Sequence, residues 1–406
     1  MNHSRSRVVS CPTKSRALHL GHDFNPNRTQ TPPYSKGEKI ALNGFRWIHT
    51  IGVLILLIFS ITNGFAQSTL AERLDALCLE EHTWMGFWGV VLMARGENIL
   101  FEKGYGFADC DHSRLIHPNL KFRIASITKQ ITAAAILKLS EENRLTLQDP
   151  LSKYLPAFSK HPEITLYQLL THTSGIVTLL NTSSELNDRI QTYPGETTLE
   201  KTLAYLHEQP LRFNPGEGFY YSNGGYAILS AVIEKVTGQS YADYLKKTFF
   251  IPLEMTDTGY DPNAYDESWA IPCHRLSVEP DAVEPAPWVN RDIPYGAGGL
   301  YSTARDLLKW SVALGKGELL QPETLRLMET PQSEVYGNGL GVFIEHPPFN
   351  GIRYRLVFHD GATAGSSTHL SRYVDKDLTI VILSNLDDYD FTMLAYQLAK
   401  IVFSEE

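Results

Sequence analysis

The pattern of apolar and polar positions after residue 66 predicts a helix, then a hairpin, then a second helix. Apolar residues recur at helical spacing in Thr69–His82, and Ser68 is placed to cap this helix. Two β-rich runs then flank a turn at Arg95–Asn98, which is typical of a β-hairpin. The second helix is predicted from about Ser126 to Glu142. Because the turns after its start are almost wholly apolar, it should be buried on most faces.

The middle of the chain is predicted to hold helices and loops. Tyr226–Gly238 is apolar at helical spacing and ends in a glycine that suits a helix C-cap. Ser302–Leu314 is a further predicted helix, and its first residue is able to cap it. The stretch Glu279–Pro294 contains several prolines, which predicts a long loop that lines or covers a site.

Strands return towards the C-terminus. Strand-like runs occupy Tyr354–Asp360, Ser366–Val374 and Leu378–Asn385, and a last helix is predicted at Phe391–Phe403. Strands therefore come from both ends of the body, with helices between them. The simplest fold class with this order is α+β, with an antiparallel β-sheet flanked by helices and an inserted all-α region.

These elements divide the chain into a leader and one large domain. The leader is residues 1–66 and the domain is residues 67–406. Within the domain, the sheet is predicted from about 67–110 and 340–406, and the helical and loop insert from about 126–335. A chain of 406 residues is long enough for one such domain with a large core.

The leader has the pattern of a secretory signal. Arg46 supplies a basic flank and Ile51–Ile61 a mostly apolar run, and small residues follow at Gly64 and Ala66. We therefore expect cleavage after Ala66 and a periplasmic or secreted body. The apolar run is shorter than the roughly 20 residues that span a bilayer. The alternative is a membrane attachment through residues 47–66 that is never cleaved.

Charge is distributed unevenly along the chain. Residues 1–66 contain eight Lys or Arg and two Asp or Glu, whereas the remainder contains 28 basic and 43 acidic residues. An acidic body without a basic stripe is a poor partner for nucleic acid, so we expect no nucleic-acid ligand. Residues 1–45 are polar, basic and non-periodic, and they are either a disordered tail or an over-long gene model.

The four cysteines are Cys11, Cys78, Cys110 and Cys273. They form no CxxC pair and no metal-ligand pattern, so the sequence predicts neither a metal site nor a cofactor. Cys11 would leave with the leader. We expect the others to be separate buried thiols, and a Cys78–Cys110 disulfide is the alternative.

The first chemical signal is Ser126-Ile-Thr-Lys129, at the start of the second helix. Residues i and i+3 are neighbours on one helix face, with Cβ atoms about 5–6 Å apart. A serine needs a base to act as a nucleophile, and Lys129 can be that base only while its amine is neutral. The free N–H groups of a helix N-terminus also suit an oxyanion. Since S-x-x-K occurs by chance, the alternative is a capped helix with a surface lysine.

The second signal is "FNPGEGFYYSNGGYAIL", in which a Pro-Gly turn precedes Tyr221-Ser-Asn223. A loop held in this way can present a phenol and an amide to a cleft. Tyr221 could share a proton with Lys129 and pass it to a leaving group. Asn223 could hydrogen-bond Lys129 or a substrate carbonyl. The alternative is a turn followed by a helix cap.

The third signal is "VFHDGATAGSSTHL", in which a strand at Tyr354–Phe358 runs into His359-Asp360-Gly361. A glycine on an edge strand allows another backbone to approach closely. The N–H of Ala362 would then be free to bind a substrate carbonyl, as the second half of an oxyanion hole. A lone histidine before a turn more often has a structural role.

Together the three signals resemble the serine β-lactamase or penicillin-recognising family, and most of all its branch of class C β-lactamases, DD-carboxypeptidases, D-aminopeptidases and family VIII-type esterases. That family carries S-x-x-K, Y-x-N and a K/H-x-G triad in this order. The resemblance covers most of Gly86–Phe403 and includes flanking phrases such as "ITLYQLLTHTSGI" (Ile164–Ile176) and "GAGGLYSTARDL" (Gly296–Leu307). It implies the same antiparallel sheet with flanking helices and an all-α region.

The resemblance implies an exported serine hydrolase that acts through a covalent acyl-enzyme on an ester or amide. Ser126 would be the acylated nucleophile, Lys129 its base and Tyr221 the proton shuttle. The substrate would be a small molecule or a peptide, and no cofactor is implied. The alternatives are a β-lactamase or DD-carboxypeptidase proper, or a slowly acylating penicillin-binding sensor. The G-x-S-x-G elbow of α/β-hydrolases and the H-E-x-x-H motif of metallohydrolases do not occur.

The resemblance also assigns the residues that would bind substrate. Asn223 fits a role in binding a substrate amide or orienting the lysine. His359 and Gly361 would lie on the strand that lines the cleft, and the N–H of Ala362 would pair with that of the nucleophile as the oxyanion hole. His359 stands where β-lactamases of this branch carry lysine, which favours peptidase-like or esterase-like members.

Asp360 is the second departure from the family pattern. It replaces the Thr or Ser whose hydroxyl can bind a substrate carboxylate. If Asp360 faced the cleft, its charge would repel a carboxylate and favour a positive amine or a neutral ester. Because neighbours on a strand alternate between faces, Asp360 could equally point away from the site.

Overall fold

The computed structural model describes most of the domain. It covers residues 68–178, 198–262, 264–275, 282–286, 295–333, 335–387 and 389–405. The predictions for the leader, and for most of Glu279–Pro294, lie outside the described residues. Within the described ranges, no helix combines the length and hydropathy required to cross a bilayer.

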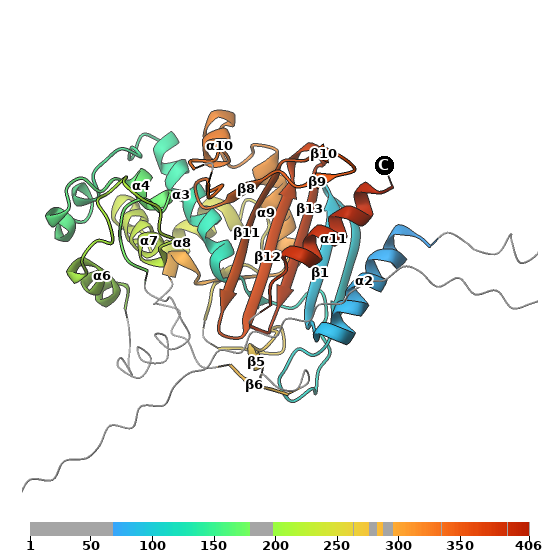
Figure 1. Cartoon of the computed structure of the whole chain (residues 1–406). Coiled ribbons are helices and arrows are strands. Elements are labelled where there is room, and N and C mark those ends of the chain that lie inside the picture. The colour runs from blue at the N-terminus through green and yellow to red at the C-terminus, as the bar shows by residue number, and fades with distance from the viewer. Residues whose placement is uncertain are drawn as a thin grey trace, which may run out of the picture. The chain divides into compact units, whose positions relative to one another are not determined.

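A six-stranded antiparallel sheet forms the centre of the domain (Figure 1). Its strand order is β2-β1-β13-β12-β11-β8, so the N-terminal hairpin lies beside the C-terminal strands. This arrangement confirms the predicted α+β fold, with an antiparallel sheet built from both ends of the body. The six strands are β1 (Gly89–Arg95), β2 (Asn98–Tyr105), β8 (Phe343–Glu345), β11 (Leu356–Thr363), β12 (Ser366–Tyr373) and β13 (Leu378–Ser384).

The central strands bury side chains on both faces of the sheet. In β1, Val90 and Leu92 join one hydrophobic cluster, whereas Val91 and Met93 join the other. β13 follows the same period of two. Because both faces are covered, these strands appear in the sequence as continuous apolar runs and not as alternating ones.

Helices cover both faces of the sheet (Figure 1). α2 (Leu70–Met85) and α11 (Thr392–Phe403) pack together on one face. α9 (Ala304–Gly315) packs against β1 and β13 on the other face. The predicted terminal helices therefore cover the same side of the sheet.

Two helices have an N-cap one residue later than the predicted one. The hydroxyl of Thr69 accepts the N–H of Glu72, whose carboxylate accepts the N–H of Thr69, so Thr69 and not Ser68 caps α2. Likewise Thr303 and not Ser302 caps α9. A capping hydroxyl accepts a backbone N–H two or three residues further along the helix. Where two hydroxyl residues are adjacent, the sequence alone does not decide between them.

The all-α region lies beyond β11 and β8 (Figure 1). Its central helix, α3 (Thr128–Glu141), buries eleven of its fourteen residues, as the apolar pattern predicts. α3 packs against α7 (Asn223–Thr237), which begins three residues before the predicted start and ends at the predicted C-cap, Gly238. The other helices are α4 (Leu166–Leu170), α6 (Leu199–Glu208), α8 (Tyr241–Leu245) and α10 (Pro322–Met328).

Short elements connect these layers. β3 (Phe122–Arg123), β7 (Leu300–Ser302) and β4 (Gly259–Tyr260) form a small sheet, and two-stranded ribbons pair β5 (Cys273–Arg275) with β6 (Val283–Pro285) and β9 (Pro348–Phe349) with β10 (Ile352–Arg353). Single turns of 3-10 or π helix lie at η1 (Ala125–Ile127), η2 (Leu151–Lys153), η3 (Pro156–Lys160), η4 (Lys246–Phe250), η5 (Tyr295–Ala297) and η6 (Val374–Lys376).

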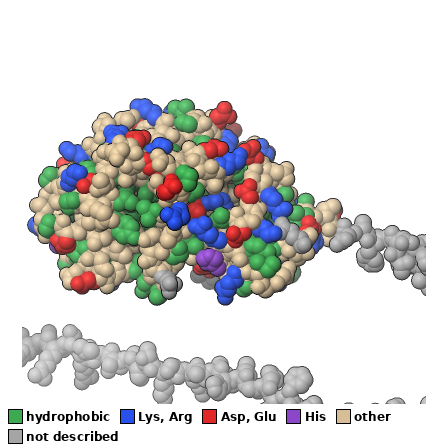
Figure 2. All heavy atoms as spheres, turned by 90° about the horizontal axis from the view of Figure 1, so that it is seen from above, with side chains coloured by type: hydrophobic (Ala, Val, Ile, Leu, Met, Phe, Trp, Pro, Cys, Tyr) green, Lys and Arg blue, Asp and Glu red, His purple; other side chains and the backbone are tan. Residues whose placement is uncertain are grey.

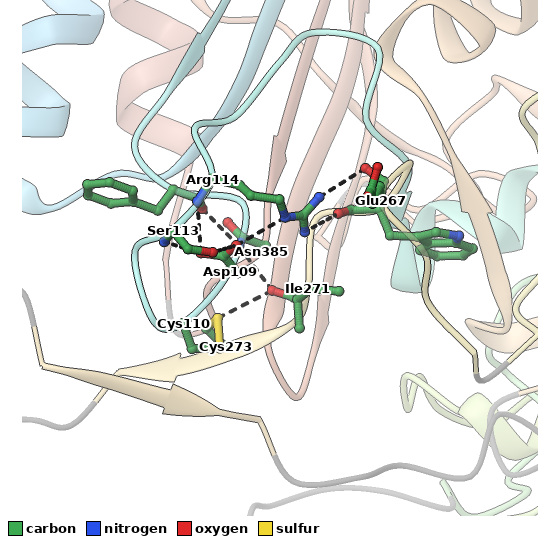
Figure 3. A network of polar contacts seen from close by, with 10 residues as sticks. Asp109, Cys110, Ser113, Arg114, Glu267, Ile271, Cys273 and Asn385 are labelled. Atoms are coloured by element: carbon green, nitrogen blue, oxygen red, sulfur yellow. Dashed lines mark hydrogen bonds and ion pairs between the residues drawn. A yellow bond between two sulfur atoms is a disulfide. The ribbon is translucent and has the colours of Figure 1, made fainter.

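Cys110, in the loop after β2, and Cys273, the first residue of β5, form a disulfide bond across a sequence separation of 163 residues (Figure 3). The N–H of Cys273 donates to the carbonyl of Asn385 at 2.8 Å, which fixes the start of β5 beside the end of β13. The predicted separate thiols are therefore wrong for this pair, and so is the Cys78–Cys110 alternative. Cys78 is free, and burial raises its pKa to about 12. The tertiary fold brings these two cysteines together, and their spacing in the sequence gives no indication of it.

The surface of the domain carries mixed charge. On the face seen in Figure 2, Lys and Arg side chains are interspersed with Asp and Glu side chains and with apolar ones. Surface ion pairs such as Lys103–Asp75 and Arg305–Glu102 join the two signs. Interspersed charges of this kind are typical of a solvated surface.

Candidate active site

Ser126 lies in a tight turn directly in front of α3. It belongs to η1, whose first residue, Ala125, holds a φ of +44° that is rare for a residue with a side chain. Lys129 follows one turn later and is fully buried. Its Nζ is 2.9 Å from Ser126 Oγ. The two side chains therefore face each other, as the i, i+3 spacing predicts.

Three oxygens surround the amine of Lys129. Its Nζ is 2.9 Å from Ser126 Oγ, 2.7 Å from Asn223 Oδ1 and 2.8 Å from the carbonyl of Ala297. Burial lowers the pKa of Lys129 well below its ordinary value. A neutral amine has two N–H donors and one lone pair. The two N–H groups suit Asn223 Oδ1 and the Ala297 carbonyl, which only accept, and the lone pair suits the Ser126 hydroxyl, which can donate. The neutral amine of Lys129 can therefore take a proton from Ser126.

Tyr221 and Asn223 come from the loop that leads into α7. Ser222, between them, is the N-cap of α7, which fixes the residues on both sides. The Tyr221 phenol lies near Ser126, and Lys129 Nζ lies 4.7 Å from the centre of the Tyr221 ring. Burial raises the pKa of Tyr221 above its ordinary value, so the phenol keeps its proton. It is therefore suited to donate a proton and not to remove one.

His359 lies in β11 on the same side as Tyr221, with the two ring centroids 6.1 Å apart. The sequence placed His359 just before a turn. In the structure β11 continues to Thr363, so His359 lies within the strand. Its Nδ1 lies 2.6 Å from the Asp360 carbonyl, which can only accept, so Nδ1 carries the proton. Burial and the nearby Lys129 lower the pKa of His359 to about 4. The ring is therefore neutral at pH 7.

Gly361 allows β11 to approach the turn that holds Ser126. A Cβ atom on Gly361 would lie 2.2 Å from Thr368 Oγ1 and 2.5 Å from the Ile124 carbonyl. It would also lie 3.1 Å from Ser126 N. β8 pairs only with the first three residues of β11, so this part of the strand is an edge. The close approach supports the prediction that the N–H groups of Ser126 and Ala362 bind one oxyanion.

Asp360 lies on the other face of the sheet. Its Oδ1 is 2.6 Å from Nδ1 of His369, the residue opposite it on β12. His359 and Gly361, on either side of Asp360, face Tyr221 and Ser126. The Asp360 carboxylate is therefore not aimed at Ser126.

Two groups at the site did not follow from the sequence. The carbonyl of Ala297 accepts from Lys129, and buried His172 packs its ring 4.6 Å from that of Tyr221. Both lie in phrases that resemble the family, "GAGGLYSTARDL" and "ITLYQLLTHTSGI". For His172, the resemblance of "ITLYQLLTHTSGI" to the family was the signal in the sequence that could have indicated a role at the site. A backbone carbonyl has no side chain by which a sequence could single it out.

The described part of the site carries little positive charge. Burial lowers the pKa of Lys129, of His359 and of His172. Among the described residues, burial therefore disfavours the cationic form of each basic side chain that contacts Ser126 or Tyr221. Within the same ranges, no three His, Cys, Asp or Glu side chains are placed to hold a metal ion.

Comparison with known proteins identifies relatives over most of the domain. The model of the family described as Beta-lactamase matches residues 85–403. Penicillin-binding protein 4* of Bacillus subtilis is 29% identical over 326 residues, covering 74% of this chain and 69% of that protein. Esterase EstB of Burkholderia gladioli is 30% identical over 364 residues, covering 78% of this chain and 91% of the esterase.

A solved structure gives the same result for the fold. The D-stereospecific amidohydrolase from Streptomyces sp. superposes with a TM-score of 0.66 at 26% sequence identity. The superposition covers 77% of this chain and 94% of that enzyme.

Proposed function

Because this chain belongs to the beta-lactamase family and is a serine hydrolase that acts through an acyl-enzyme, we propose that Ser126 is the acylated residue and that its substrates are neutral esters or amides. The observation that carries the proposal is the 2.9 Å contact between Ser126 Oγ and the buried amine of Lys129. A serine becomes a nucleophile when a neutral base lies within hydrogen-bond distance of its hydroxyl.

Acylation begins with the transfer of a proton from Ser126 Oγ to Lys129 Nζ. Oγ then forms a bond to the carbonyl carbon of the substrate, and the carbonyl electrons move onto the oxygen. The N–H groups of Ser126 and Ala362 would stabilise that oxyanion, since preformed donors contribute most where charge develops. Asn223 Oδ1 and the Ala297 carbonyl hold the resulting ammonium in place.

The tetrahedral intermediate collapses when the leaving group departs. The bond between the carbonyl carbon and the leaving oxygen or nitrogen breaks, and Tyr221 gives its phenolic proton to that atom. The proton on Lys129 replaces the one that Tyr221 has lost. Water then attacks the acyl carbon and gives a proton to Lys129 Nζ. The bond between that carbon and Ser126 Oγ breaks, Lys129 returns the proton to Oγ, and the acid leaves.

The charge of the site favours neutral substrates. A β-lactam or a peptide with a free C-terminus brings a carboxylate, which needs a cation or a hydroxyl to bind it. His359 stands where β-lactamases of this branch carry lysine, and its low pKa keeps it uncharged at neutral pH. The relatives include an esterase and a D-stereospecific amidohydrolase, so ester and amide substrates both have precedent among them.

We also propose that the domain is exported. The leader has a basic flank, an apolar run and small residues before Gln67, which is the pattern of a secretory signal. The Cys110–Cys273 disulfide supports export, because such bonds form and persist in oxidising compartments. Sequencing the N-terminus of the protein from its native host should find Gln67. Full-length protein confined to the cytoplasm would contradict export.

The decisive experiment measures acylation and turnover together. A fluorophosphonate should add to the protein at Ser126, as located by mass spectrometry of its peptides. p-Nitrophenyl acetate should be turned over, and Ser126→Ala should abolish both results. Thr128→Ala, one position before Lys129, is a control that leaves the nucleophile and base in place. Nitrocefin hydrolysis much faster than ester hydrolysis would overturn the preference for neutral substrates, and absence of an adduct would overturn the proposal.

A further inference from the structure

His172 touches Tyr221 but takes no part in the steps above. It is 4% exposed, and its ring centroid lies 4.6 Å from that of Tyr221. It follows α4 and holds a φ of +61°. Side-chain-bearing residues adopt that conformation at a cost of about 1–3 kcal/mol, and it persists only where the surroundings fix it.

Hydrogen bonds fix the backbone just before His172. The hydroxyl of Tyr226 donates to the Leu170 carbonyl at 2.8 Å. The side-chain amide of Asn338 donates to the Thr171 carbonyl at 3.0 Å. Since α7 and the segment before β8 supply these donors, His172 cannot relax to an ordinary φ without breaking contacts to both.

His172 in turn holds the backbone on both sides of Tyr221. The N–H of Tyr220 donates to the His172 carbonyl at 2.9 Å. The N–H of Ser222 donates to His172 Nδ1 at 3.1 Å. Because a backbone N–H can only donate, Nδ1 accepts, and the proton of the neutral ring is on Nε2. Burial lowers the pKa of His172, and a proton on nearby Lys129 or His359 lowers it further, so the neutral, accepting form of the ring is favoured.

We propose that His172 is the positioning residue for the proton donor, holding Tyr221 where its hydroxyl meets the leaving group of the substrate. This inference rests on the proposed function. Tyr220 and Ser222, on either side of Tyr221, are both hydrogen-bonded to His172. The Tyr221 ring packs against the imidazole of His172. A general acid must lie within hydrogen-bond distance of the atom that it protonates, so a small shift of the loop is costly.

The test uses two esters that differ only in their leaving group. p-Nitrophenolate departs from p-nitrophenyl acetate without needing a proton, whereas the alkoxide of ethyl acetate must be protonated as it leaves. His172→Leu keeps an apolar side chain but removes the acceptor. It should lower kcat/KM for ethyl acetate about 100-fold and for p-nitrophenyl acetate by less than about 5-fold. A merely structural role would lower both equally.

Two further variants control for the loss of the ring and for the unusual φ. Asn tolerates positive φ and places an acceptor oxygen at the δ position, so His172→Asn should restore most of the ethyl acetate activity. His112 also has a positive φ, 60°, and stacks its ring on Phe107 in a loop after β2. His112→Leu should therefore leave the ratio of the two activities unchanged.

A double variant decides whether His172 acts through Tyr221. If it does, adding His172→Leu to Tyr221→Phe should cost little more, because the proton donor is already absent. Equal losses for both esters, losses that add to those of Tyr221→Phe, or no rescue by His172→Asn would each overturn the inference. A wild-type protein that forms no acyl-enzyme would instead overturn the proposed function.

Discussion

At the scale of single residues, burial sets the charge of the site. Lys129 has no carboxylate among its hydrogen-bond partners, and desolvation alone lowers its pKa. His172 and His359 are also buried, and the charge of Lys129 lowers the pKa of both. A proton on any one of these groups makes a proton on the others less favourable. The site therefore tends to be neutral as a whole, which is the state that a lysine base requires.

Gly361 should be needed for activity because of the space that a side chain would fill. In Gly361→Ala, the Cβ would meet backbone at 2.5 Å and push β11 away from Ser126. We expect kcat/KM for p-nitrophenyl acetate to fall by roughly 100-fold or more, as when an oxyanion donor is lost. Gly225→Ala is the control, since its Cβ would meet nothing closer than 3.6 Å. Wild-type activity in Gly361→Ala would contradict the oxyanion role of this edge.

His359 should make stability depend on pH. Its pKa is about 4 in the folded protein, against about 6.5 in the unfolded chain, so between these values the unfolded chain binds more protons. The free energy of unfolding should therefore rise with pH between these two values, and this stabilisation should be lost as pH falls towards 4. Between pH 4 and pH 7, urea unfolding should show a rise roughly 3 kcal/mol larger for wild type than for His359→Gln. Parallel pH dependences would contradict a buried, neutral His359.

The sequence could predict those site residues that act through the chemistry of their side chains, but not their orientation or the roles of backbone groups. Ser126, Lys129 and Tyr221 stand in spacings that carry a chemical meaning, and the structure brings them together. The face occupied by Asp360 could not be predicted. Side chains alternate between the two faces of a strand, so the face of one residue is known only once that of a neighbour is known. The Ala297 carbonyl acts through its backbone, which every residue shares.

At the scale of elements, the cap of α2 gives a clean test. Thr69 forms a reciprocal capping pair with Glu72, whereas Ser68 lies outside it. Thr69→Ala should lower the free energy of unfolding by about 1 kcal/mol. Ser68→Ala is the matched control and should change it by less than roughly 0.5 kcal/mol. Urea denaturation measures both, and equal effects would contradict the assignment of the cap.

Elements with a long apolar pattern could be predicted, and short ones could not. β13 and α3 have enough consecutive buried positions to reveal their type. β3 and β4 contain two residues each, and their pairing with β7 depends on contacts made after the chain has folded. The end of β11 was also missed, because its last residues pair with β12 without a continuous apolar pattern.

At the scale of the whole molecule, the disulfide should stabilise the fold. Replacing both cysteines, Cys110→Ser with Cys273→Ser, should lower the free energy of unfolding by about 2–5 kcal/mol. The physical reason is that the bond restricts an unfolded chain across a separation of 163 residues. Urea denaturation with and without dithiothreitol measures this effect. The reductant should destabilise wild type by a similar amount and leave the double variant unchanged; a wild type insensitive to reductant would contradict the bond.

The pairing of β1 with β13 also sets the order of events during synthesis. Residues 89–95 reach the ribosome exit long before residues 378–384, their partners in the sheet. Contacts between such distant parts of a chain form late and slowly, because loop closure must precede them. The strand that carries Gly361 arrives just as late. Ser126 is therefore synthesised early, but we expect it to gain activity only after residues 356–384 have left the ribosome, because β11 to β13 complete its site.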